Sequence, residues 1–143
     1  MPYCTEADIK KLLPESMLIN LTNDTAGATT IDAVNLGEAI DQADREIDSY
    51  VSIAGYAVPF VVVPPLIANL SVKMAIWNLH LRKYFNSEIW EKTYKSCLRL
   101  LERISQGKQK IAPEVDGTVT GASGGYACSS RTQELDQTLW DTF

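Results

Sequence analysis

The segment from residue 65 to about residue 84 constrains the fold most, because its apolar residues cover two faces of one helix. At 100° per residue, one face collects large apolar side chains: Leu66, Leu70, Met74, Trp77, Leu81 and Tyr84. The opposite face is apolar too, with Ala68, Val72, Ala75, Ile76 and Leu79. Such a helix either lies at the centre of its domain or presents one face to a partner. In the second case, Val72, Ile76 and Leu79 are the residues we expect in the interface.

Prolines separate this helix from the preceding one. Residues 56–65 contain three prolines and three consecutive valines, a composition that favours an extended crossover over a helix. Pro65 then falls in the first turn of the new helix, where its missing N–H costs nothing.

Two further segments each carry a single apolar stripe. In the first, which Asn35 would cap and Gly55 would end, the stripe steps by four and three residues through Leu36, Ile40, Ala43, Ile47, Tyr50 and Ala54. The second segment runs from Ser87, a good N-cap, to about Gln106 before Gly107. Its stripe contains Trp90, Tyr94, Cys97, Leu101 and Ile104.

Two short helices are predicted near the N-terminus. Thr5 and Asp8 have the spacing of a capping box, and Pro14 ends the helix that follows. Residues 15–21 predict a second short helix that buries Met17, Leu18 and Leu21, and residues 22–34 read as a polar loop. The fold class is therefore all-α, with four to five helices and an extended proline-rich crossover.

A chain of 143 residues fits one domain, and its composition changes after residue 110. We assign residues 1–110 to a helical domain and residues 111–143 to a flexible C-terminal arm, because residues 113–130 hold four glycines and no helical period. We expect the apolar residues near its end to dock on a partner or on the domain: Leu135, Leu139, Trp140 and Phe143.

Charge is segregated along the chain. Residues 1–64 carry three basic and ten acidic side chains, and residues 65–110 carry nine basic and three acidic ones. The acidic face of the residue 35–54 helix comprises Glu38, Asp41, Asp44 and Asp48, and the basic face of the last helix comprises Lys92, Lys95, Arg99 and Arg103. The basic face is either simply solvated, or binds an acidic partner such as another copy of the chain, or contacts DNA phosphates. The overall net charge of −5 makes DNA the third choice.

The residues give little support for catalysis or metal binding. His80 has no second histidine or cysteine pair beside it in the sequence, and Cys4, Cys97 and Cys128 form no CxxC motif. The loop around Asp24 lacks the spacing of a calcium loop, because alanines occupy ligand positions. The glycines of residues 117–125 precede no Lys-Ser or Lys-Thr pair. We expect no catalytic residue, cofactor or metal, and read the protein as a non-enzyme.

Membrane insertion and secretion are not expected either. No apolar run approaches 18 residues, and the first residues lack the basic and apolar regions of a secretory signal. Three cysteines, an odd number, suit a reducing compartment better than a disulfide framework.

Several motifs resemble a phage family found in Mu-like prophages. The similarity extends over about residues 3–110. The motifs are Tyr3-Cys4-Thr5 followed by Ala7-Asp8-Ile9, Ile19-Asn20-Leu21-Thr22, the acidic Ala-Asp-Arg-Glu-Ile-Asp-Ser-Tyr of residues 43–50, Tyr56-Ala57-Val58-Pro59-Phe60 with Val63-Pro64-Pro65-Leu66, and Gly107-Lys108.

This family looks related to the helical head–tail connector, or adaptor, proteins of tailed phages. The resemblance implies a structural protein that forms a ring of its own copies between the portal and the tail. The implied partners are portal and tail or head-completion proteins, with non-specific contact to packaged DNA and none to membranes. The implied locations are the virion neck and, during assembly, the cytoplasm of the bacterial host.

Two other functions are kept as alternatives. The basic face from Lys92 to Arg103 would suit a small helical DNA-binding or regulatory protein of a prophage. An enzyme is motivated only by Cys4, His80 and Cys97, and would require a thiol within hydrogen-bond reach of the imidazole.

Overall fold

Five α-helices form the part of the chain that the structure, a computed structural model, describes: residues 1–111. They are α1 (Glu6–Leu12), α2 (Glu15–Thr22), α3 (Ala33–Ile53), α4 (Pro65–Arg82) and α5 (Glu88–Ser105). These residues contain no strand, so the predicted all-α class is confirmed. The predicted arm lies outside the described residues except for Ile111, which is buried and donates its N–H to the Tyr56 hydroxyl at 3.1 Å.

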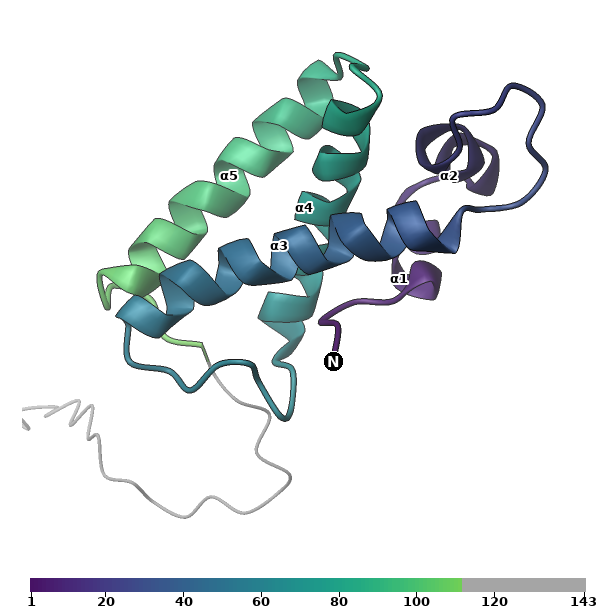
Figure 1. The fold of residues 1–143 in the computed structure, drawn as a ribbon. Coiled ribbons are helices and arrows are strands. Elements are labelled where there is room, and N and C mark those ends of the chain that lie inside the picture. The colour runs from purple at the N-terminus through teal and green to yellow at the C-terminus, as the bar shows by residue number, and fades with distance from the viewer. Residues whose placement is uncertain (112–143) are drawn as a thin grey trace, which may run out of the picture.

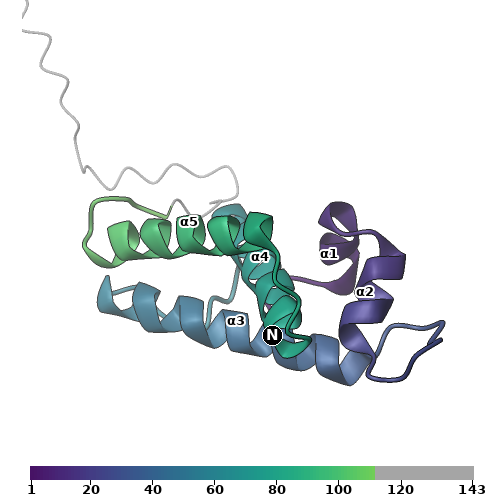
Figure 2. The same cartoon turned by 90° about the horizontal axis from the view of Figure 1, so that it is seen from above.

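The three long helices pack against one another, and the two short ones cover a further side (Figure 1). Helices α3 and α4 run in opposite directions, since Asp44 bonds to Ser71 while Ala39 bonds to Asn78. Helix α5 packs on both α3 and α4. Seen at right angles, α1 and α2 lie together on the side of α4 away from α5 (Figure 2). Helix α4 thus has neighbours on several sides.

Local sequence signals account for most helix ends. The capping box of Thr5 and Asp8 is present, Pro65 opens α4, and Gly55 follows α3 with a φ of 87° that a glycine adopts without strain. One predicted cap is wrong. Helix α3 begins at Ala33, because the Asp32 carboxylate accepts the N–H groups of Val34 and Asn35.

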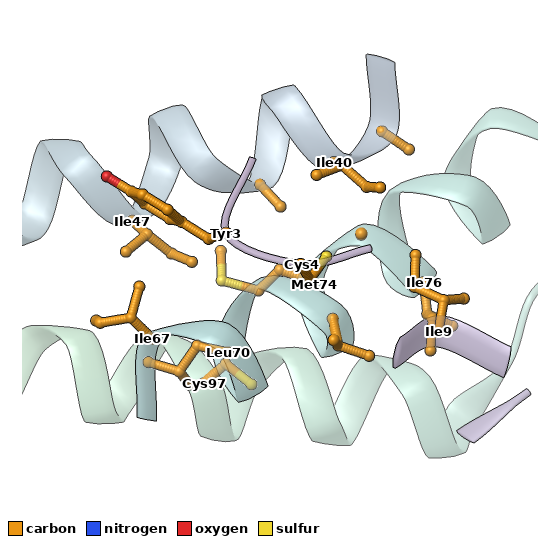
Figure 3. Close-up of a cluster of buried hydrophobic side chains, with 14 of the residues drawn as sticks. Tyr3, Cys4, Ile9, Ile40, Ile47, Ile67, Leu70, Met74, Ile76 and Cys97 are labelled. Carbon is orange, nitrogen blue, oxygen red and sulfur yellow. The ribbon is translucent and has the colours of Figure 1, made fainter. Parts of the chain in front are cut away.

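Helix α4 is the central helix, so the first of the two alternatives for its apolar faces is correct. Val72, Ile76 and Leu79 are buried within the subunit, and their expected place in a partner interface is therefore wrong. The physical reason is the cover supplied by the N-terminal helices: Ile9 of α1 lies next to Ile76 (Figure 3). Leu18 of α2 is fully buried as well.

Polar residues on the flanks of α4 are buried too, and each has a partner. Asn78 donates to the carbonyl of Ala39 at 3.2 Å. Ser71 donates to Asp44 Oδ1 at 2.6 Å. Within residues 1–111, no buried side-chain nitrogen or oxygen lacks a hydrogen bond. The core therefore satisfies its polar groups without outside help.

A hydrogen-bonded cluster ties the N-terminal residues to α3 and α4. Asp44 is 9% exposed and accepts the Tyr3 N–H at Oδ2 (2.8 Å) and the Ser71 hydroxyl at Oδ1. The Tyr3 hydroxyl donates to Asp48 at 2.5 Å and accepts the N–H of Phe60 at 3.1 Å. Asp44 is thus a core residue, and its predicted role on an acidic surface is wrong, because the N-terminal segment covers it.

Replacing Asp44 should destabilise the fold strongly. The Asp44→Ala change leaves the Tyr3 N–H and the Ser71 hydroxyl without their acceptor inside the protein, which should lower the free energy of unfolding by about 2–3 kcal/mol. Urea denaturation measures this loss. Asp41→Ala, on an exposed position of the same helix, is the matched control and should change stability by less than about 0.5 kcal/mol. Equal losses in the two variants would show that the cluster is unimportant.

Two aspartates should titrate on opposite sides of the ordinary pKa of about 3.9. The hydrogen bonds from Lys11 and Thr5 lower the pKa of Asp8 to about 2, so its stabilising contribution is present above pH 4 and is lost as the pH falls towards 2. Burial, reinforced by Asp48 and Asp41, raises the pKa of Asp44. The folded state therefore favours the protonated Asp44 carboxyl. The stability that comes from this protonation is present at low pH and is lost as the pH rises through the folded pKa. NMR titration of the carboxyl carbons measures both, and an Asp44 pKa below that of Asp8 would contradict the assignment.

Candidate interaction surfaces

Exposed apolar side chains occur at the end of α3 and in the extended crossover that connects α3 to α4. Val61 is 93% exposed, and Val62 and Ile53 are also mostly exposed. We call these three residues the crossover patch. No charged residue occurs between Asp48 and Lys73, so the crossover itself carries no charge. Depletion of charge together with exposed apolar area is typical of a protein interface.

The crossover is held in place by contacts from its other residues. The Phe60 ring packs edge-on against Tyr3, with ring centroids 5.8 Å apart, and its N–H bonds to the Tyr3 hydroxyl. Tyr56 contacts Phe60 and accepts the N–H of Ile111. The Val58–Pro59 peptide bond is cis. Because these residues fasten the crossover to the core, Val61 and Val62 are presented on a supported loop.

A second apolar surface lies at the other end of α4. We call it the corner patch, and it consists of Leu81, Tyr84, Phe85 and Ile89 around the α4–α5 connection. Tyr84 is 95% exposed and has a φ of 55°, in the left-handed region that normally favours glycine. Its N–H bonds to the Leu81 carbonyl while the Phe85 N–H bonds to the His80 carbonyl, which is a Schellman motif with tyrosine in the glycine position.

A groove of about 420 Å³ opens beside the corner patch, between α2 and the start of α5. It is lined by Met17, Asn20, Leu21, His80, Phe85, Ser87, Ile89 and Trp90. Met17 was expected in the core, but it is half-exposed here because it faces the groove instead of α4. The groove is therefore an apolar hollow with the polar groups of Asn20, Ser87 and His80 in its wall.

Some residues of the two predicted charged faces are buried or already bound within the subunit. On α3, Glu38 and Asp41 are exposed, whereas Asp44 is buried and Asp48 binds Tyr3. On α5, Lys92 pairs with Glu88 and Lys95 with Glu91, each at 2.6 Å. Arg99 and Arg103 are exposed and form no ion pair with any residue of the described part. The predicted basic face therefore reduces to two arginines that have no ion-pair partner within residues 1–111.

No hydrogen bond joins the His80 imidazole to the Cys4 or Cys97 thiol in the described part of the chain. The His80 ring nitrogen Nδ1 lies 2.9 Å from the carbonyl oxygen of Ile76 and the ring packs near Trp90. Burial raises the pKa of Cys4 to about 11 and also raises that of Cys97, so neither is a thiolate at neutral pH. The Asp24 carboxylate, once considered for calcium, binds Arg82 and Lys83. No group of three potential metal ligands occurs within residues 1–111.

The predicted C-terminal anchors Leu135, Leu139, Trp140 and Phe143 lie outside the described residues. Among the helices described, none is both long and apolar enough to cross a membrane. The crossover and corner patches were not predicted, although the uncharged run from residue 49 to residue 72 and the Tyr84-Phe85 pair after a helix end were available as signals.

Tyr84 should be less favourable for folding than glycine at the same position. A non-glycine residue in the left-handed region costs about 1 kcal/mol, and an exposed ring recovers little of it. Tyr84→Gly is therefore expected to raise the free energy of unfolding by up to about 1 kcal/mol, measured by urea denaturation. Leu81→Gly, in the last turn of α4, is the control and should destabilise, because glycine is unfavourable inside a helix. A destabilised Tyr84→Gly variant would mean that the ring contributes to the fold.

Comparison with known proteins identifies the family. No curated protein matches the chain. The family described as Bacteriophage Mu, Gp36 matches residues 3–130, which is most of the chain. This match agrees with the Mu-like motifs at the N-terminus, in the acidic helix and in the proline crossover. The chain therefore belongs to the Bacteriophage Mu Gp36 family and is a phage protein.

Proposed function

We propose that this phage protein is a head–tail connector, or adaptor, that forms a ring of its own copies between the portal and the tail. The observation that carries the proposal is the presence of two dissimilar apolar surfaces at opposite ends of α4. These are the crossover patch and the corner patch with its groove. A ring requires an interface in which each copy uses two different surfaces, whereas a symmetric dimer uses the same surface twice.

The separation of the two surfaces suits such an assembly. Helix α4 has 18 residues, which corresponds to a length of about 27 Å, and it is buried through its middle. The subunit therefore acts as a rigid body with one apolar surface at each end. Surfaces placed this far apart on one subunit cannot be covered by a single small partner, but successive copies can cover them in turn.

Some of the exposed charges on α3 and α5 suit the rims of contacts with neighbours. Glu38 and Asp41 of α3 carry the opposite sign to Arg99 and Arg103 of α5. We propose that these residues face other copies, the portal, or tail and head-completion proteins, where they would orient binding more than strengthen it. The two arginines could also contact packaged DNA without sequence preference. This role places the protein in the virion neck, with assembly in the host cytoplasm.

A small DNA-binding or regulatory protein is the second candidate, and the structure favours it less. Its motivation is the basic face of α5, but two of the four cations have carboxylate partners at 2.6 Å. Fewer free cations mean fewer phosphate contacts and weaker binding at physiological salt.

Loss of the protein should leave heads and tails unjoined. When its gene is inactivated in the phage, we expect DNA-filled heads and separate tails, because the piece that joins them is missing. Electron microscopy of the lysate scores the particles, and a specific antibody should label the neck of wild-type virions. Supplying the gene in trans is the control and should restore joined virions. Joined, infectious particles without the protein would contradict the proposal, as would labelling elsewhere on the virion.

A further inference from the structure

We propose that the crossover patch of one copy docks into the groove of the next copy, so that Val61 and Val62 contact Ile89, Phe85 and Met17. This inference rests on the proposed ring and deepens it by naming the two surfaces that meet. The occupant of the groove is thus a second copy of this chain. The following arguments concern shape, apolar character and charge.

The shapes of the two surfaces are complementary. The crossover patch projects from the subunit, with Val61 93% exposed on a loop held by Phe60 and Tyr56. The groove is hollow and measures about 420 Å³. A cavity of about 150 Å³ is enough to bind benzene. The groove therefore has room for the side chains of both valines.

The two surfaces also agree in their lack of charge. The uncharged run between Asp48 and Lys73 includes the whole crossover patch. The wall of the groove is formed by apolar residues with the polar groups of Asn20, Ser87 and His80. Docking would therefore bury apolar area without removing an aspartate, glutamate, lysine or arginine from water, which is the costly step in many interfaces.

The carboxylates next to the groove are paired within the subunit. Glu88 and Glu91, in the first turn of α5, form ion pairs with Lys92 and Lys95, each at 2.6 Å. Arg103, in the last turn of α5, and Lys108 just beyond it are exposed at the other end of that helix. The contact that we propose therefore depends on the burial of apolar area and not on an ion pair between the copies.

The groove has one competing occupant, the C-terminal residues of the same chain. Their apolar side chains include Leu139 and Trp140, and Cys128 lies before them in the sequence. This alternative can be separated from the proposal experimentally, because Cys128 reports on that segment while Val61 reports on the crossover.

Disulfide trapping tests the pairing directly. Two full-length variants are prepared, Val61→Cys with an affinity tag and Ile89→Cys without one, both with Cys128→Ser so that the native thiols left, Cys4 and Cys97, are buried. They are mixed as concentrated purified chains, and are also co-expressed during phage growth so that both enter virions. After mild oxidation we expect a mixed dimer on non-reducing electrophoresis, and no dimer from either variant alone. Val34→Cys mixed with Ile89→Cys is the matched control, since Val34 is 70% exposed and belongs to neither surface.

A charge placed in the contact should weaken it without affecting the fold. Val61→Asp should reduce self-association, measured by sedimentation or by incorporation into virions, at least about tenfold, because it buries an unpaired carboxylate. Val34→Asp should change neither association nor the melting temperature. Unchanged association in Val61→Asp would overturn the proposal.

The trapping result separates this inference from the proposed function. Neck labelling of virions without a Val61–Ile89 mixed dimer overturns the inference and leaves the connector role intact. A mixed dimer from a protein that is absent from the neck supports the contact and removes the connector role. A dimer from Val61→Cys alone would indicate a symmetric contact and overturn the pairing. With Cys128 retained, a bond between it and the Ile89→Cys thiol would assign the groove to the C-terminal residues instead.

Discussion

The middle of α4 is buried on nearly every side, and the rest of the structure depends on this burial. A helix with apolar residues on two faces is stable in water only if both faces are covered. Here α3 and α5 cover one side, and the short helices α1 and α2 cover the other. The subunit therefore completes its own core along the length of α4, and the most exposed apolar side chains near its two ends are Val61 and Tyr84.

The short helices that cover α4 are attached to the rest of the subunit by buried and partly buried hydrogen bonds. Helices α1 and α2 have 7 and 8 residues and would not be stable alone. They are held by the residues around them: Tyr3 is bonded to Asp44 and Asp48, and Thr22, fully buried, accepts the N–H of Asp32. The Tyr3 bonds join residues 41 and 45 positions apart, and the Thr22–Asp32 bond closes the loop between α2 and α3. Acidic residues that a sequence pattern assigns to a surface are therefore used to attach the N-terminal segment.

The sequence predicts the helices well because periodicity, prolines and glycines act locally. Pro65, Gly55 and the Thr5–Asp8 capping box all mark helix ends in the structure. What covers a helix face is a non-local property, and for this reason Ile76 and Leu79 could not be assigned to the core from α4 alone. Asp44 and Met17 show the same limit in opposite directions. Asp44 has a charged side chain, which is typical of a surface, but it is buried. Met17 has an apolar side chain, which is typical of a core, but it borders a groove.

Both ends of α4 are fixed by contacts within the subunit, which bears on the assembly that we propose. The crossover is fastened by Phe60 and Tyr56, and the corner is fixed by the Schellman motif around Tyr84, so both surfaces are formed before any partner binds. Preformed surfaces lose less conformational entropy on association than segments that must order. Tyr84 occupies a backbone conformation that glycine would adopt at lower cost, and its ring is almost fully exposed in the subunit. Residues in unfavourable conformations that folding does not require are concentrated at functional sites. In the proposed ring, contact with another copy would therefore account for the exposed apolar residues of the corner.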